Sequence, residues 1–431
     1  MRVAWPAAAA LALAACGGGN DPDPTLIPGG GIADPDIDGE VNVFVIDEDS
    51  DQPIEGAAVH LGDDLEGETD AEGLLVATDV SGPQTITIIA GGYTPTTWVG
   101  VDGANVTIPV GPMEVSSDFE QGAVRGTIDG WEDLPVPAQR ANIAVVNYTA
   151  NGEDNDPANE IPQPGDPAPN VCVNAGAGAP CNYTVRTRTG QMMIFALLGD
   201  IDAEMTVRVH GFAYRGGVEV TDGDTVDGIR LDMVADEDLI EPDVSLPSAP
   251  AGTDSVAALV RFELGADGRL SLPVAGLGLE VLVPDPSLFP GSRQDLIGIA
   301  QSSDPPAERA TSISIERDIE SIADASVGIL LAPPTGIETD GTRFAFDPDE
   351  DATVHIFGVA DTGGGTRRWA VGVFDGSSEI QLPAAVSLQG GEMRFAVQAI
   401  EIPDIDLQDF ALDDLDDLVT RVAGDSVTFT R

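Results

Sequence analysis

The chain has 431 residues, of which 42% are hydrophobic, and this is enough for well-formed cores and for two to four domains of ordinary size. It carries 74 acidic and 19 basic residues, which gives a net charge of −55, and none of the basic residues is a lysine. A field of this sign repels nucleic acid and anionic lipid headgroups, so we exclude both as partners.

The N-terminal segment MRVAWPAAAALALAAC predicts an export signal that ends at a cysteine. Arg2 supplies a positive charge, and residues 3–12 form an apolar run that is too short to span a bilayer. Leu13-Ala14-Ala15-Cys16 resembles the bacterial lipobox. The resemblance implies that residues 1–15 are a lipoprotein signal peptide and that Cys16 becomes the acylated first residue of the mature chain. An ordinary secretory signal with an incidental cysteine is the alternative.

The residue after Cys16 is Gly17. In the enterobacterial pattern, an aspartate at this place holds a lipoprotein at the inner membrane. The lipobox resemblance therefore implies an outer-membrane protein, anchored by its lipid on the periplasmic or the cell-surface face.

Residues 16–39 are rich in Gly, Pro and Asp, and this composition predicts a flexible tether that buries little apolar surface. Asp34-Pro35-Asp36-Ile37-Asp38-Gly39 matches the first half of an EF-hand loop. The twelfth position of that loop is Val45, where a bidentate Glu is needed, so the pattern is incomplete.

Residues 40–115 alternate apolar and polar side chains, which is the pattern of β-strands separated by Gly and Asp turns. The segments PIEGAAV, TDAEG, DVSGPQTITI and GGYTP, in this order, resemble the carboxypeptidase regulatory-like domain. The resemblance implies a transthyretin-like β-sandwich that has no catalysis of its own. The chain contains neither His-x-x-Glu nor His-Glu-x-x-His, so we do not expect a peptidase.

Residues 122–235 repeat the alternating pattern and predict a second β-sandwich, interrupted by a Pro, Asn and Gly-rich insertion at 152–180. Cys172 and Cys181 lie nine residues apart on either side of VNAGAGAP, a segment that can turn back easily. We predict that they form a disulfide that pins the insertion, which agrees with export to an oxidising compartment. Two free thiols are the alternative.

The C-terminal half predicts two further β-rich units, which follow a linker at 237–253. The first covers residues 254–332. The second covers 333–431 and resembles a fibronectin type III-like sandwich, because paired prolines precede its first strand and Trp369 lies in a central one. Near-helical spacing also predicts a short amphipathic helix within it, through Leu407, Leu415, Leu418 and Val422. The predicted fold is therefore all-β, with tandem β-sandwich domains.

Clusters of carboxylates are the only candidate cofactor sites, and the cofactor would be calcium. Asp347, Asp349 and Asp351 lie at a predicted hairpin tip and supply oxygen ligands at alternate positions. We favour solvated turns over calcium sites, because a chain this acidic forms such clusters by chance; no cofactor is expected, and calcium is the alternative. Two other clusters have the same composition: Asp47, Glu48, Asp49 and Asp51, and Asp222, Asp224 and Asp227.

The sequence does not predict an enzyme. No Gly-x-Ser-x-Gly occurs, and His60, His210 and His355 are too far apart in sequence to form a recognisable triad or metal site. We predict a lipid-anchored cell-envelope protein that displays non-catalytic binding or structural modules, with an envelope protein or a glycan as partner. The alternative is a calcium-dependent adhesin or a carbohydrate-binding or carbohydrate-active surface protein. Four aromatic side chains could form a stacking surface for a glycan, but we favour a place in the cores for them: Tyr93, Trp98, Trp131 and Tyr214.

Overall fold

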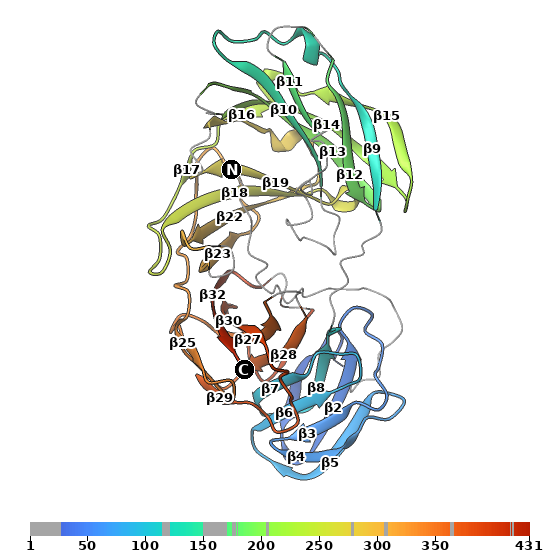
Figure 1. Ribbon diagram of the computed structural model, residues 1–431, viewed down its shortest axis with the longest axis vertical. Helices are drawn as coiled ribbons and strands as arrows, with labels where there is room; N and C mark the ends of the chain where they lie inside the picture. Colours follow the sequence, from blue (N-terminus) through green and yellow to red (C-terminus); the bar gives the residue numbers. More distant parts are fainter. Residues whose placement is uncertain are drawn as a thin grey trace.

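The computed structural model describes residues 27–113, 121–149, 170–174, 178, 180–203, 207–276, 280–305, 309–362, 366–413, 415 and 418–431. Within these residues the protein is all-β, as predicted, and its helices are single 3-10 turns. The molecule is elongated, and one half contains β9–β19 while the other contains β1–β8 and β25–β32 (Figure 1).

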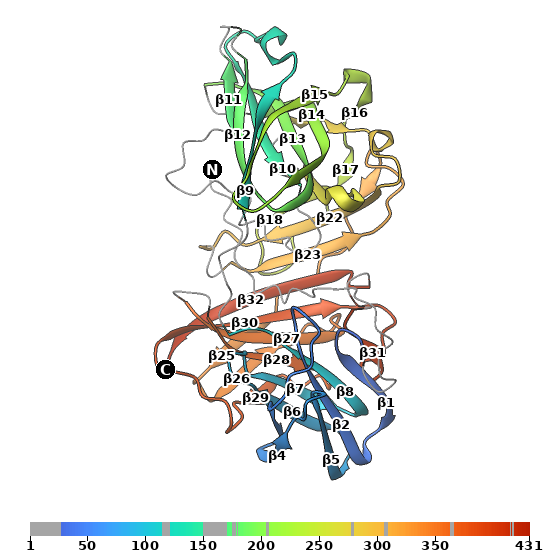
Figure 2. The ribbon, with the colours of Figure 1, turned by 90° about the vertical axis from the view of Figure 1, so that its right-hand side faces the viewer.

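A twelve-stranded sheet runs through both halves of the molecule (Figure 2). Its strands come from three separate parts of the sequence, residues 58–101, 255–316 and 354–430. Its order is β19 (Arg269–Ala275), β18 (Ser255–Glu263), β22 (Arg293–Gln301), β23 (Thr311–Glu316), β32 (Arg421–Thr430), β30 (Glu392–Glu401), β27 (Val354–Asp361), β28 (Arg367–Val373), β7 (Thr96–Val101), β6 (Gln84–Ile89), β3 (Ala58–Leu61) and β4 (Asp64–Glu68).

The N-terminal unit is a two-layer sandwich. One layer consists of β7, β6, β3 and β4 of the twelve-stranded sheet, and the other is a separate five-stranded sheet. Val41, Val43 and Val45 alternate along one strand of that second layer and are fully buried between the layers, as their spacing predicts. The order of the second layer is β31 (Phe410–Ala411), β1 (Gly31–Asp36), β8 (Gly103–Val110), β2 (Asp38–Asp47) and β5 (Leu74–Ser81).

The folded part of the chain begins earlier than the composition predicts. Gly31–Asp36 forms β1, which pairs with β8 and with β31, and Ile32 and Ile37 are buried in the core of the sandwich. Burial of these two isoleucines outweighs the low apolar content of the surrounding residues. The prediction that the tether extends to residue 39 is therefore wrong, and the residues of the partial EF-hand pattern lie mainly on β1 and β2.

The C-terminal unit is also a two-layer sandwich. A three-stranded sheet packs against β32, β30, β27 and β28, and the core between them contains Phe344, Phe357, Phe395 and Trp369. Trp369 is 1% exposed, which confirms its predicted place in the core. The three-stranded sheet has the order β25 (Thr335–Thr339), β26 (Arg343–Asp347) and β29 (Glu379–Gln381).

The predicted amphipathic helix is not formed. The described residues between 404 and 420 form turns, irregular segments and the two-residue strand β31, and Val422 lies on β32. Leu415 is buried against the N-terminal sandwich and Leu418 is exposed. The apolar residues of this segment therefore attach an irregular loop to the core. Within this loop, β31 pairs with β1.

Residues 121–233 form a strongly curved sheet around a core of their own. The opposite face of β13 and β14 presents Met193, Phe195 and Phe212, and these side chains pack against β18, β19 and β22. The strand order is β11 (Val171–Asn174), β10 (Ala141–Tyr148), β13 (Gly190–Ile201), β14 (Val207–Val220), β15 (Thr225–Met233), β9 (Gln121–Ile128) and β12 (Asn182–Arg188).

Short strands and turns complete the connections around this curved sheet. The strand β20 (Glu280–Val281) extends it by pairing with β14. The other short elements are β16 (Leu239–Ile240) with β21 (Val283–Pro284), β17 (Val244–Ser245) with β24 (Ala325–Ser326), and the 3-10 turns η1 (Trp131–Asp133), η3 (Asp236–Asp238), η4 (Gly265–Asp267) and η5 (Pro286–Leu288).

Several strand pairs join the segments that the sequence divides into separate domains, and two of these pairs lie within the twelve-stranded sheet. Residues 370–373 of β28 pair in parallel with 96–99 of β7, and residues 311–314 of β23 pair antiparallel with 421–424 of β32. Trp369 reinforces the first joint, because its Nε1 donates a hydrogen bond of 2.9 Å to Oγ1 of Thr97 within the buried sheet. Main-chain hydrogen bonding therefore joins the units predicted at 40–115 and at 254–332 to the unit predicted at 333–431.

We predict that Thr97→Val lowers the free energy of unfolding by about 1–3 kcal/mol, because it leaves the buried Trp369 N–H without this acceptor. Valine keeps the shape and the strand preference of threonine. Urea denaturation followed by tryptophan fluorescence measures the loss. Thr78→Val, at an exposed position of β5, is the control and should change little. Equal stabilities of the two variants would contradict the assigned contact.

Candidate functional site

The predicted lipidation site, Cys16, lies outside the described residues. No helix among the residues that the structure describes is long and apolar enough to cross a membrane. The lipobox interpretation therefore remains a prediction from the sequence.

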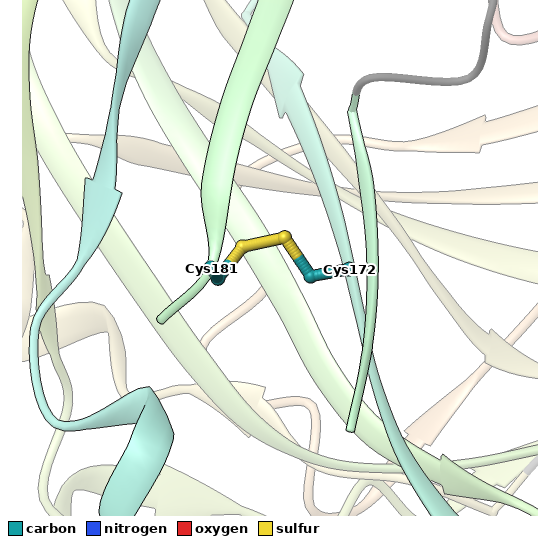
Figure 3. Close-up of a disulfide and its surroundings, with 2 residues drawn as sticks. All are labelled: Cys172 and Cys181. Carbon is teal, nitrogen blue, oxygen red and sulfur yellow. A yellow bond between two sulfur atoms is a disulfide. The ribbon is translucent and has the colours of Figure 1, made fainter. Parts of the chain in front are cut away.

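The predicted disulfide between Cys172 and Cys181 is confirmed (Figure 3). The two Cα atoms are 5.6 Å apart, and Cys181 is 1% exposed. Cys172 lies on β11 and Cys181 immediately precedes β12, and these strands are the two ends of the curved sheet. No ladder between β11 and β12 is found in the described part of the chain, so the disulfide joins two edges that main-chain hydrogen bonds leave apart.

We predict that the double variant Cys172→Ala/Cys181→Ala loses about 2–3 kcal/mol at most, because the disulfide closes a short loop. The curved sheet should remain folded, since its ladders and core do not include the S–S bond. Thermal unfolding by circular dichroism measures the loss, and the far-ultraviolet spectrum reports the sheet. Two titratable thiols in the native exported protein, with unchanged stability of the variant, would contradict this role.

In the predicted calcium cluster, the carboxylate of Asp349 makes hydrogen bonds within the protein. Asp349 accepts hydrogen bonds from the main-chain N–H groups of Asp351, at 2.8 Å, and Ala332, at 3.1 Å. Asp347 lies at the end of β26. Among the described residues, no group of three or more Asp, Glu, His or Cys side chains is gathered as a metal site. Calcium binding at Asp347, Asp349 and Asp351 stays a prediction.

The second acidic cluster is connected to protein donors as well. Asp47 accepts hydrogen bonds from the Ser50 main chain, at 2.9 Å, and from the Tyr93 hydroxyl, at 2.7 Å. Burial alone would raise the pKa of Asp47, but the hydrogen bonds outweigh burial and hold it below its usual value. Burial raises the pKa of Glu48, and Arg367, 3.4 Å away, only partly offsets this. These two carboxylates therefore fix the β2–β3 loop to its neighbours.

The third cluster has protein partners too. Asp222 accepts a hydrogen bond from the Gln121 main chain, at 3.2 Å, and Asp224 accepts one from the hydroxyl of Thr221, at 2.6 Å. Both contacts stabilise turns at the edge of the curved sheet. Asp227 lies 3.8 Å from a guanidinium nitrogen of Arg125 in an exposed ion pair.

The aromatic candidates for a glycan surface are divided among different cores. Trp98 belongs to the core of the N-terminal sandwich and Trp131 to that of the curved sheet, and they are 5% and 1% exposed. Tyr93 bonds to Asp47, and Tyr214 packs edge-on against Phe289. These residues do not form one stacking surface, and the core interpretation holds for both tryptophans.

The histidines are equally separate. His60 lies on β3, His210 on β14 and His355 on β27. His210 Nε2 is 3.4 Å from Asp200, whereas His355 packs against the ring of Phe346. Burial lowers the pKa of His355, so its imidazole favours the neutral form.

A row of alternating charges, which the sequence analysis missed, crosses one end of the twelve-stranded sheet. Glu263 on β18 is directly opposite Arg269 on β19 and directly opposite Arg293 on β22. One pleat further along β18, Arg261 is opposite Asp295 of β22. Side chains two residues apart on a strand share a face. Three arginines and two carboxylates therefore alternate over three adjacent strands.

Short contacts order this arginine–carboxylate row. The Nε of Arg269 lies 2.9 Å from Glu263, and a terminal nitrogen of Arg261 lies 2.6 Å from Asp295. Arg261 Nε is 3.1 Å from the other oxygen of Glu263, and Arg293 Nε is 3.5 Å from Asp295. The Asp295 carboxylate is fully buried, while the side chains of Arg269 and Arg293 are each one-third exposed.

The opposite face of these strands holds the row in position. Phe262, between Arg261 and Glu263, is fully buried and packs edge-on against Phe289, which lies just beyond η5. Leu270 and Leu296 alternate in the same way with the charged residues of β19 and β22. The alternating segments VRFE, GRLSL and SRQDL indicate in the sequence that these charged residues lie on one face of each strand. The sequence does not indicate the cross-strand register that brings the arginines together.

The row opens into a shallow cleft of about 350 Å³, formed by the β18–β19 turn and the loop before β22. Its charged lining consists of Glu263, Arg269 and Arg293, and its rim contains Gly265, Gly268 and Gly291. A cleft of this size accepts a small ligand. Its chemistry is that of recognition by guanidinium groups rather than of a nucleophile or a proton donor.

No protein-family model matches the chain, and a search of curated proteins finds no match.

Proposed function

We propose that this protein is an exported lipoprotein, anchored at the outer membrane through Cys16, that presents non-catalytic β-sandwich modules at the cell envelope. The observation that carries the proposal is the sequence Leu13-Ala14-Ala15-Cys16 at the end of a short apolar run. The Cys172–Cys181 disulfide supports it, because such bonds persist in oxidising compartments.

The arrangement of the strands supports the structural part of the proposal. The N-terminal unit places β1, β8, β2 and β5 over β7, β6, β3 and β4, as expected for a transthyretin-like sandwich of the carboxypeptidase regulatory-like kind. The C-terminal unit places three strands over four, as expected for a fibronectin type III-like sandwich. Both modules serve as scaffolds in this proposal.

The large negative charge agrees with a displayed protein. The net charge of −55 keeps the chain soluble and repels anionic headgroups, so attachment to the membrane depends on the lipid alone. Two acyl chains provide stable anchoring where a single chain does not. In this proposal the described modules stand clear of the bilayer on the tether that precedes β1.

We predict that Cys16→Ser moves the full-length protein from the membrane fraction to the soluble fraction and removes the acyl mass. Fractionation with immunoblotting and mass spectrometry of the N-terminal peptide measure both effects. The Cys172→Ala/Cys181→Ala variant is the matched control, because it removes cysteines without changing the proposed anchor. Retention of Cys16→Ser in the membrane with unchanged mass would contradict the proposal.

A further inference from the structure

We propose that the cleft at the arginine–carboxylate row binds a small ligand through one oxyanion group, a carboxylate, sulfate or phosphate. This site goes beyond the proposed function and does not depend on lipid anchoring. It is formed by β18, β19 and β22, and the residues that contact the oxyanion are Arg269 and Arg293.

The row is a local exception to the negative charge of the chain. Three arginines face the carboxylates of Glu263 and Asp295, and Asp318 lies 3.8 Å from Arg293, so the row and this neighbour are together neutral within a chain of −55. Three of the chain's 19 basic residues are therefore concentrated on three adjacent strands. Long-range repulsion is screened within about 8 Å at physiological salt, so contacts inside the cleft determine local binding.

The geometry of the row suits an oxyanion. Arg269 and Arg293 lie on either side of Glu263, on strands that are two positions apart and therefore about 10 Å from each other. Long arginine side chains can converge from that separation, and the planar guanidinium matches the oxygen atoms of a carboxylate, sulfate or phosphate. Glu263 holds the guanidinium group of Arg269, and the carboxylates of Asp295 and Asp318 lie 3.5 Å and 3.8 Å from Nε of Arg293, so both arginines are positioned before a ligand arrives.

The turn and the loop that form the cleft are held in place by contacts with the rest of the protein. The carboxylate of Asp267, in the β18–β19 turn, accepts hydrogen bonds from the Gly217 main chain, at 2.9 Å, and from Gln191, at 2.8 Å. These contacts fix the turn against the curved sheet. Phe289 lies 5.4 Å from Tyr214 and 5.5 Å from Phe262, between ring centroids, and fixes the loop that carries Gly291. A preformed site needs little ordering when a ligand binds.

The surroundings limit the ligand to a small one. A polyanion or an anionic surface would experience the repulsion of the whole chain, whereas a small ligand brings only one or two negative charges into the cleft. The volume of about 350 Å³ also fits a small molecule. The glycine rim allows close approach of the ligand to the main chain.

Isothermal titration calorimetry of the purified full-length protein with sodium phosphate, sodium sulfate and sodium acetate tests the site. We expect saturable binding of at least one anion, weakened about tenfold or more in Arg269→Gln and in Arg293→Gln, because each removes a charge-assisted contact. Arg269→Lys should recover part of the affinity, since it restores the charge without the planar fork.

Arg230→Gln is the matched control. Arg230 forms an exposed ion pair with Asp129 on the curved sheet, away from the cleft, so this variant should keep the full affinity. Thermal unfolding verifies that each variant is folded. If Arg293→Gln is not folded, the affinity of Arg269→Gln decides the test. Absence of saturable binding of all three anions, or equal affinity in Arg269→Gln and the wild-type protein, would overturn the proposal. Neither result bears on the anchoring at Cys16.

Discussion

Main-chain pairing between distant segments is the interaction on which the whole structure depends. The contact between Trp369 and Thr97 joins residues 272 positions apart, and the β28–β7 ladder beside it unites the N-terminal and C-terminal sandwiches. The β23–β32 ladder then connects this pair to the other half of the molecule. Because one sheet serves as a layer in several cores, the units cannot shift past one another without breaking ladder hydrogen bonds.

The two edges of the twelve-stranded sheet carry different side chains. At one end, β4 has the sequence DLEGE, and its exposed carboxylates discourage pairing with another strand. At the other end, β18, β19 and β22 have their apolar face against the curved sheet, so the opposite face is free to carry polar groups. The arginine–carboxylate row occupies that face. The cleft therefore follows from the strand alternation and from the packing of Phe262 and Phe289 beneath it.

Local patterns allowed the strands and the disulfide to be predicted, because both depend on residues close in sequence. Val41, Val43 and Val45 are buried as their spacing requires, and Cys172 and Cys181 can meet across a short, Gly-rich turn. The tether predicted from composition was wrong at β1, because burial of Ile32 and Ile37 was enough to add a strand to the sheet. The helix predicted from the spacing of apolar residues at 404–422 was also wrong, because Leu407, Leu412 and Leu415 attach a loop to the core.

The arginine–carboxylate row could not be predicted because it depends on register between strands. Arg269, Glu263 and Arg293 are separated by turns and loops in the sequence, and only the pairing of β18 with both neighbours places them in one line. The same limit applies to the β28–β7 and β23–β32 joints. Their strands show ordinary alternation, which does not specify a partner far along the chain.

Cross-linking at the β23–β32 joint tests the continuity of the sheet most directly. Ser312 and Ala423 are opposite each other and buried, and residues at such positions have Cα atoms about 4.5–5.5 Å apart, within reach of a disulfide. In a Cys16→Ser background, Ser312→Cys/Ala423→Cys should form a disulfide that mass spectrometry detects, and Ser312→Cys/Asp425→Cys, two residues out of register, should not. Free thiols in the first variant, or equal cross-linking in both, would contradict a continuous sheet.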